Sequence, residues 1–385
     1  MIAGRASIAI GLVAYGVMAV GSGLDRISRQ SPALEYAVPS PFRAEADRAA
    51  ASTALIRKDN IAAVNYARRA VASDPADTEA AALLGSALLI SRQDDAADKA
   101  FRVAARFGWR DVATQGYFYD VALQEGDLRV AADRADALLR THPNIVDQQR
   151  LLEPFESQTA GAAILAEHLQ LRPAWMASYL ALPANSSPEQ LDRRFRVIAQ
   201  LNSRKVSLGC DMVAPFAVSL LRSYRWEEAK TLWNANCPQA KITGPVGAMT
   251  FAGVDTYVGP ELPFSWQPMR SGDVTLSHEG PANANLRVIN SSSATRLILY
   301  QSVAFPPGAY QLRVHADGRQ PATGTLIATI GCNGTTPYPV NPDGDLLTVG
   351  QTLRADQCPG QILSLWLSGS GSSAELQSLE IRKVG

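Results

Sequence analysis

The sequence has few charged residues and few histidines, and neither positive nor negative charge is in excess. Charged residues make up 19% of the 385 residues, and 36 basic side chains balance 36 acidic ones. A protein that binds nucleic acid normally carries a clustered basic face, so this balance argues against a nucleic-acid partner. The four histidines are scattered and form no His-x3-His pair. We therefore predict no metal site and no cofactor.

The signatures of several enzyme classes are missing as well. The chain has no Gly-x-Ser-x-Gly nucleophile motif, no Gly-x4-Gly-Lys phosphate loop and no dinucleotide fingerprint. The glycine- and serine-rich stretch 369–373 follows a predicted strand and precedes no predicted helix, which favours a hairpin turn. Asp343 and Asp345 flank Gly344 in another turn signal, for which a structural calcium ion is the alternative. We expect no enzyme activity and no catalytic residues; a glycan-cleaving carboxylate pair is the alternative.

One long apolar run stands at the N-terminus. Residues 6–24 contain no charged side chain and approach the length of about 20 residues that a helix needs to cross a bilayer. We interpret this run as a transmembrane anchor, and a signal peptide cleaved near Gly21 is the alternative. Pro32, Pro39 and Pro41 follow and predict an extended linker over 25–41.

All the cysteines lie far beyond this run. They are even in number, which suits disulfide bonds in an oxidising compartment. We predict that Cys210 pairs with Cys237 and that Cys332 pairs with Cys358, with buried free thiols as the alternative.

A period of 34 residues runs through the first half of the chain. Ala63, Ala97 and Ala131 are 34 residues apart, and Pro75 and Pro143 are two periods apart. The middle copy carries the fullest pattern, which consists of Leu84, Gly85, Ala97, Phe101 and Ala104. This pattern resembles the tetratricopeptide repeat, which implies antiparallel helix pairs stacked into a solenoid.

Small residues in such a pattern let helices approach closely. Gly85 and Ala97 would bring the two helices of a pair together, while Phe101 fills the gap to the next pair. We expect the clearest repeats over 44–145, with an unrelated alanine-rich bundle as the alternative. Later signals extend the helical part: Ser187 followed by Pro188 predicts a helix start, and 226–233 resembles one more repeat helix.

The character of the sequence changes near Gly244. Glycine and proline become denser, and runs of alternating polar and apolar residues replace the helical period. Strands are predicted over 295–303, 309–315, 324–330, 361–367 and 375–381. Tyr310, Leu312 and Val314 would face inward in one of them. We therefore expect an antiparallel β-sandwich.

Short motifs of this second part resemble the jelly-roll domains of the carbohydrate-binding-module type found in bacterial envelope proteins. The motifs are 264–266, 305–312 and the Cys332/Cys358 pair. The resemblance implies a sugar site, for which Tyr300 and Trp366 would supply aromatic faces and Arg313 a polar partner. The alternative is that Trp366 is buried under a loop.

These features predict a chain that is α-helical first and all-β afterwards. We expect a membrane helix over 1–24, the linker over 25–41, a tetratricopeptide-like solenoid over 42–243 and a β-sandwich (jelly roll) over 244–385. The expected function is that of a non-enzymatic, single-pass scaffold of the bacterial inner membrane, with periplasmic repeats that bind a protein partner during envelope polysaccharide assembly or export. A carbohydrate-binding protein is the alternative function, a glycan-active enzyme the third, and a secreted or periplasmic protein the alternative location.

Overall fold

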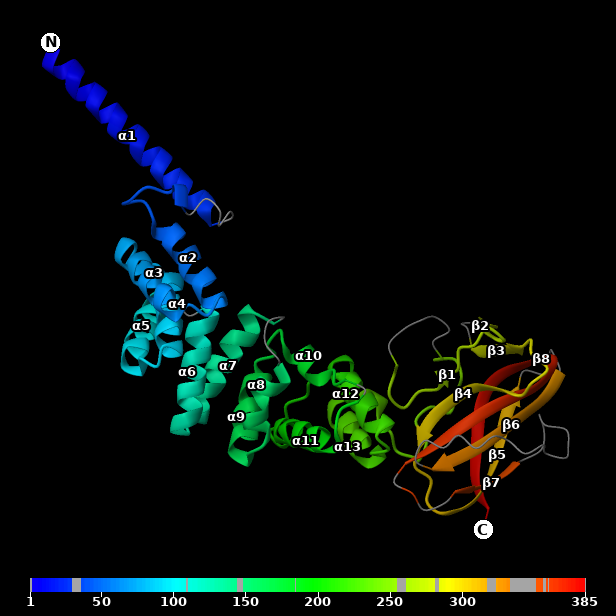
Figure 1. Cartoon of the computed structure of the whole chain (residues 1–385). Coiled ribbons are helices and arrows are strands. Elements are labelled where there is room, and N and C mark those ends of the chain that lie inside the picture. The colour runs from blue at the N-terminus through cyan, green and yellow to red at the C-terminus, as the bar shows by residue number, and fades with distance from the viewer. Residues whose placement is uncertain are drawn as a thin grey trace. The chain divides into compact units, whose positions relative to one another are not determined.

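The computed structural model describes residues 2–29, 36–108, 110–143, 148–183, 185–254, 261–280, 284–316, 323–332, 351–355, 358 and 360–384. The chain divides into two compact units, Met1–Trp175 and Met176–Gly385, within which most of its contacts lie. An apolar helix comes first, packed helices follow, and a curled antiparallel sheet comes last (Figure 1). This order confirms the predicted fold class.

The first unit is helical. Its helices are α1 (Ile2–Ser28), α2 (Ala44–Ile56), α3 (Asn60–Ser73), α4 (Thr78–Ile90), α5 (Asp94–Phe107), α6 (Val112–Glu125), α7 (Leu128–Thr141), α8 (Gln148–Glu156) and α9 (Thr159–Gln170). Helices α2, α4 and α6 begin 34 residues apart, and so do α3, α5 and α7. Three antiparallel pairs therefore repeat with the period that the sequence predicts.

Each of these pairs turns in the same way. The turns contain Lys58, Arg92 and Gly126, which are again one period apart. All three have a left-handed backbone conformation, with φ of 62°, 58° and 76°. In two of the turns an aspartate follows: Asp59 caps α3 and Asp127 caps α7 by accepting hydrogen bonds from backbone amides. Because a cap satisfies an amide that the helix leaves unpaired, these residues fix where the second helix of the pair begins.

Small residues let the repeat helices pack closely. Ala97 and Ala104 of α5 are completely buried. A Cβ atom on Gly85 of α4 would lie only 2.9 Å from the Phe101 ring of α5, so any side chain there would force the two helices apart. The same ring stacks on Tyr117 of α6, with 4.3 Å between the ring centroids. Phe101 therefore links its own pair to the next one.

The second unit begins with helices α10 (Met176–Leu180), α11 (Pro188–Ser203), α12 (Cys210–Arg222), α13 (Trp226–Asn236) and the 3-10 helix η2 (Pro238–Ala240). The hydroxyl of Ser187 caps α11 by accepting from the amide of Gln190, as the sequence predicts. The predicted disulfide between Cys210 and Cys237 is present and joins the start of α12 to the end of α13.

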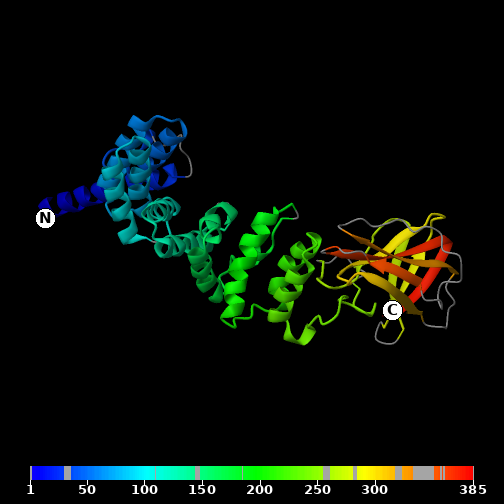
Figure 2. The same cartoon turned by 90° about the horizontal axis from the view of Figure 1, so that it is seen from below.

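The sheet of the second unit curls around one core (Figure 2). Its strands are β1 (Gln267–Pro268), β2 (Val274–Glu279), β3 (Asn285–Asn290), β4 (Arg296–Val303), β5 (Gly308–Ala316), β6 (Thr323–Cys332), β7 (Gln351–Ala355) and β8 (Gln361–Val384). Tyr310, Leu312 and Val314 belong to the buried core, which confirms their predicted inward orientation. The second predicted disulfide, Cys332 to Cys358, is also present.

The predicted hairpin turn at 369–373 is wrong, because β8 runs through it as one strand. Residues 361–368 of β8 pair with β4 and β6, and residues 372–384 pair with β3 and β5, while Ser373 also faces Thr323 of β6. Gly369 and Gly371 have φ of 107° and 66°, a backbone conformation that glycine adopts without strain. These glycines let the strand change partners without ending, and a glycine-rich bend has the same sequence signal as a turn.

Candidate functional site

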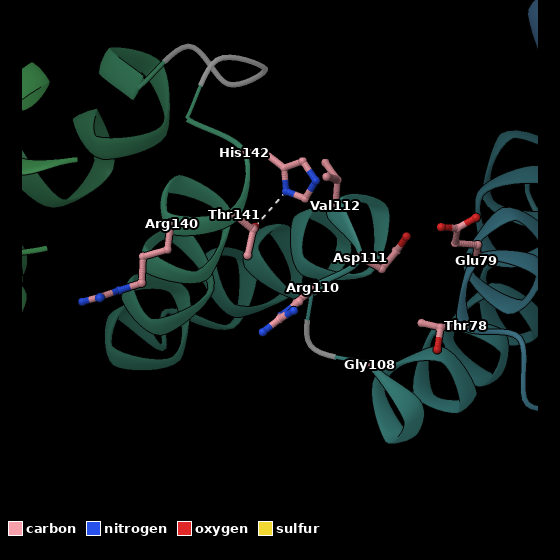
Figure 3. A pocket seen from close by; sticks show the side chains of 9 residues that line it. All are labelled: Thr78, Glu79, Gly108, Arg110, Asp111, Val112, Arg140, Thr141 and His142. Atoms are coloured by element: carbon pink, nitrogen blue, oxygen red, sulfur yellow. Dashed lines mark hydrogen bonds between the residues drawn. The ribbon is translucent and has the colours of Figure 1, made fainter. Parts of the chain in front are cut away.

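Two adjoining cavities lie along the ends of the repeat helices. The larger, of about 790 Å³, lies among the starts of α4 and α6 and the ends of α5 and α7 (Figure 3). The smaller, of about 300 Å³, lies between α2 and α4. Both include Glu79, so we treat them as one surface, the repeat groove. Its lining residues are Arg29, Glu45, Arg48, Ala49, Ser52, Thr78, Glu79, Leu83, Gly108, Arg110, Asp111, Val112, Arg140, Thr141 and His142.

The repeated helix starts shape the larger cavity. Asp77 caps α4 and Asp111 caps α6, one period apart, so both helices begin at this edge. At the end of α5, a Cβ atom on Gly108 would lie 3.0 Å from the Thr78 side chain. The absence of a side chain at Gly108 therefore leaves room between the start of α4 and the end of α5, the two helices of one pair.

Charges of both signs line the groove. Arg48 of α2 forms ion pairs with Asp77 over 3.0 Å and with Glu79 over 2.7 Å, and it also pairs with Glu45. Figure 3 shows the carboxylates of Glu79 and Asp111 pointing toward one another across the larger cavity. A surface that carries both positive and negative charges suits a polypeptide, which also carries both signs, better than a polyanion such as nucleic acid.

At the far side of the larger cavity, the polar groups bind one another. Nδ1 of His142 lies 2.7 Å from the hydroxyl of Thr141, and Arg140 forms an ion pair with Asp136 over 2.7 Å. Among the described residues, no group of three or more His, Cys, Asp or Glu side chains is placed to hold a metal ion. The groove thus offers hydrogen-bonding and ionic contacts.

The N-terminal helix is joined to the first repeat. The carboxylate of Asp25 in α1 accepts hydrogen bonds from the amides of Glu45, over 3.1 Å, and Ala46, over 2.9 Å. Asp25 is itself buried, and Ser28 donates to its backbone carbonyl over 2.6 Å. The last turn of α1 therefore caps α2, within the stretch that the sequence predicts as a linker.

A close contact strengthens this junction. A Cβ atom on Gly21 would overlap the Phe42 ring, so the ring lies directly on the backbone of α1. Within the described residues, Ile10–Ser28 is long and apolar enough to cross a membrane, as a retained span or as a signal sequence. This helix and the two disulfides point to an extracytoplasmic, envelope location.

The residues predicted to bind sugar lie at different places in the sheet. Trp366 belongs to β8, which at this point is paired with β4 on one side and β6 on the other. Its side chain is 8% exposed, and its Nε1 donates to the hydroxyl of Thr329 over 3.0 Å. Arg313 is exposed and lies opposite Glu380, toward the other end of β8.

Tyr300 is half-buried in β4, and burial, followed by the charge of Glu261, raises the pKa of its hydroxyl. Sugar binding by Tyr300, Arg313 and Trp366 stays a prediction. Asp343 and Asp345, considered above for calcium, lie outside the described residues.

The repeat positions found in the sequence are core and turn positions rather than groove residues. Leu84, Gly85, Ala97, Phe101 and Ala104 pack between the helices, while Pro75 and Pro143 follow the ends of α3 and α7. Neither the groove nor the capping role of Asp25 is predicted from the sequence. One available signal was the 34-residue spacing of Asp77 and Asp111, both typical helix caps in front of a helical run.

The chain thus combines an N-terminal apolar helix, stacked helix pairs that form a groove, and an antiparallel β-unit. No protein-family model matches this sequence, and no curated protein is similar to it.

Proposed function

We propose that this chain is a non-enzymatic scaffold of the bacterial inner membrane, anchored by α1, whose repeat groove binds a segment of a protein partner in the periplasm. The observation that carries the proposal is the junction between α1 and α2. A cleavable signal peptide has no reason to be part of the mature fold, whereas Gly21 and Asp25 both contact the first repeat.

Cleavage near Gly21 would remove the surface on which Phe42 packs. It would also leave Asp25 at a free chain end, where α1 no longer holds it against α2. The residue just before α2, Arg43, makes no side-chain cap, so α2 depends on Asp25. These contacts favour a retained anchor over the secreted or periplasmic alternative.

The groove supports a protein partner by its chemistry. Helix pairs stacked with a constant period form an extended surface, and repeat proteins bind along such surfaces. The groove combines arginines, carboxylates and hydroxyls with the apolar side chains of Leu83 and Val112. An extended peptide segment offers the matching mixture of backbone groups and side chains of both charges. A role in envelope polysaccharide assembly or export comes from the resemblance of the β-unit alone.

The anchor is tested on the mature protein from membranes. Trypsin cuts after Arg5 and Arg26, so a retained anchor yields a peptide over 6–26, whereas cleavage near Gly21 abolishes it. A matched pair of variants then tests the junction. Gly21→Leu should speed trypsin cleavage after Arg29 and after Arg43, because it displaces Phe42. Gly16→Leu should not, since nothing lies within 4 Å of a Cβ atom there. Absence of the peptide from membrane-bound protein would favour the secreted alternative.

The groove is tested by site-specific photo-cross-linking in intact cells. The cross-linker is placed at Ser52 or Val112 in the groove, and at Arg68 or Val103 on the second helices of the pairs as controls. We expect the same protein adduct from both groove positions and none from the controls. Equal adducts from all four positions, or none from the groove, would contradict the proposed docking surface.

A further inference from the structure

A separate cavity of about 350 Å³ lies at one end of the β-unit core. Its walls are the segment 241–249, which follows η2, and the ends of β5 and β8. None of the residues that the sequence singles out for sugar binding lines it. The cavity belongs to the second compact unit, so it is distinct from the repeat groove.

The wall segment is fixed at both ends by side-chain amides. Near its start, the amide of Ile242 donates to Oδ1 of Asn234 over 2.8 Å, and Nδ2 of Asn234 donates back to the Ile242 carbonyl over 2.9 Å. Near its end, the buried side chain of Gln301 makes the same reciprocal pair with the backbone of Ala248, over 3.2 and 3.0 Å. This wall is ordered before any ligand arrives, which lowers the entropy cost of binding.

The floor of the cavity is apolar. Phe305 and Tyr310 are 4% and 5% exposed, and their ring centroids are 4.8 Å apart. The hydroxyl of Tyr310 donates to the carbonyl of Pro306 over 2.7 Å, which fixes the ring. Val246 and Ile381 complete this surface. An apolar floor with few polar groups around it is typical of small-ligand sites.

Two lysines stand at the rim. Lys383 of β8 lies opposite Tyr310 of β5, and residues opposite one another in a ladder project from the same face. Its Cε lies 3.1 Å from where a Cβ atom of Gly308 would be, so the stem occupies the space that this glycine leaves. Lys241 lines the cavity from the wall segment. In the part of the chain that the structure describes, no carboxylate pairs with either lysine.

We propose that this cavity binds an acidic sugar unit. Its carboxylate would contact Lys241 and Lys383, the C–H face of its ring would pack on the apolar floor, and its hydroxyls would reach Thr243 and the backbone of the wall segment. Ligand sites span about 300–1,000 Å³, and a cavity of about 350 Å³ suits one sugar ring rather than an acyl chain. This proposal does not depend on the repeat groove or on a protein partner.

The test uses the full chain in detergent micelles and isothermal titration with three probes: methyl glucuronide, methyl glucoside and inorganic phosphate. We expect saturable binding of the glucuronide, which weakens as salt is added. Lys241→Met and Lys383→Met should each weaken it about tenfold, because each removes a charge-assisted hydrogen bond. The neutral glucoside should bind with an affinity at least about tenfold lower than that of the glucuronide, because it lacks the carboxylate that accepts the charge-assisted hydrogen bonds.

Two further variants separate the site from the fold. Lys383→Arg keeps the charge and should retain binding. Arg382 is the neighbouring residue of β8, and it pairs with Glu380 instead of lining the cavity. Arg382→Met should therefore leave binding unchanged. Equal binding of glucuronide and glucoside would overturn the proposal. So would glucuronide binding that survives loss of both lysines, or phosphate binding as tight as that of the glucuronide.

Discussion

Asp25 and Asp77 cap helices one repeat apart through equivalent hydrogen bonds. Asp25 accepts from the amides of Glu45 and Ala46, and Asp77 accepts from the amides of Glu79 and Ala80, the residues 34 positions later. Asp77 immediately precedes its own helix, whereas Asp25 reaches α2 from the end of α1. The N-terminal helix therefore supplies the cap that the first repeat lacks, so α1 and α2 share a structural element.

Replacing Asp25 should loosen the start of α2. Asp25→Ala removes both acceptors and also a negative charge that favours a helix N-terminus, so we expect a loss of about 1 kcal/mol in the free energy of unfolding. Amide hydrogen exchange should rise at Glu45 and Ala46. Asp59→Ala, which uncaps α3 at Ala62, is the control and should raise exchange there instead. Unchanged exchange at α2 in the Asp25 variant would contradict the capping role.

Two glycines in neighbouring repeats should respond in opposite ways to the same substitution. Gly85→Ala places a Cβ atom 2.9 Å from the Phe101 ring, which Tyr117 prevents from moving aside, so we expect a loss of about 1–3 kcal/mol. Gly116→Ala meets nothing within 4 Å and should gain about 0.5–1 kcal/mol, because alanine has the higher helix propensity. Thermal unfolding of both variants measures the difference. Stabilisation by both would mean that the helices of the α4–α5 pair are not in close contact.

The repeating part of the fold was predictable because its signals are local or periodic. The 34-residue spacing of Ala63, Ala97 and Ala131 correctly predicts stacked helix pairs, since each alanine occupies the same fully buried place in its pair. The alternation around Tyr310 likewise predicts the inward face of β5.

The features that the sequence did not reveal depend on contacts between distant residues. Nothing near Asp25 in the sequence indicates that it caps a helix beginning at Ala44, because its partners lie 20 and 21 residues away. The continuity of β8 was missed because Gly369 and Gly371 have the composition of a turn, and only the partner strands decide between a turn and a bend. The groove was missed because charged residues at helix starts are explained equally well by capping.

Alkaline pH should destabilise the first unit through Tyr119. Burial raises the pKa of Tyr119 from 10.0 to about 12, and its hydroxyl donates to the carbonyl of Leu151 over 2.6 Å. Because the folded state holds the proton more tightly, this stabilisation is complete below about pH 10 and is lost as the pH rises toward 12. Tyr119→Phe should lose about 1 kcal/mol at neutral pH and show a shallower alkaline decline. Urea unfolding as a function of pH checks this, with Tyr36→Phe, at an exposed site, as the control. Parallel alkaline declines in the Tyr119 variant and the native protein would contradict the assignment.

The two disulfides should contribute similar amounts of stability, although one joins two helices and the other joins the end of β6 to the segment before β8. Their sequence separations are 27 and 26 residues, and in the chain-entropy account the contribution depends on loop length rather than on the surrounding structure. Replacing either pair by alanines should therefore cost about 3 kcal/mol, measured by urea unfolding of the oxidised protein. Under reducing conditions the native protein should approach the stability of a variant that lacks both pairs. A cost confined to one pair would mean that native-state contacts around that pair, rather than restriction of the unfolded chain, determine its effect.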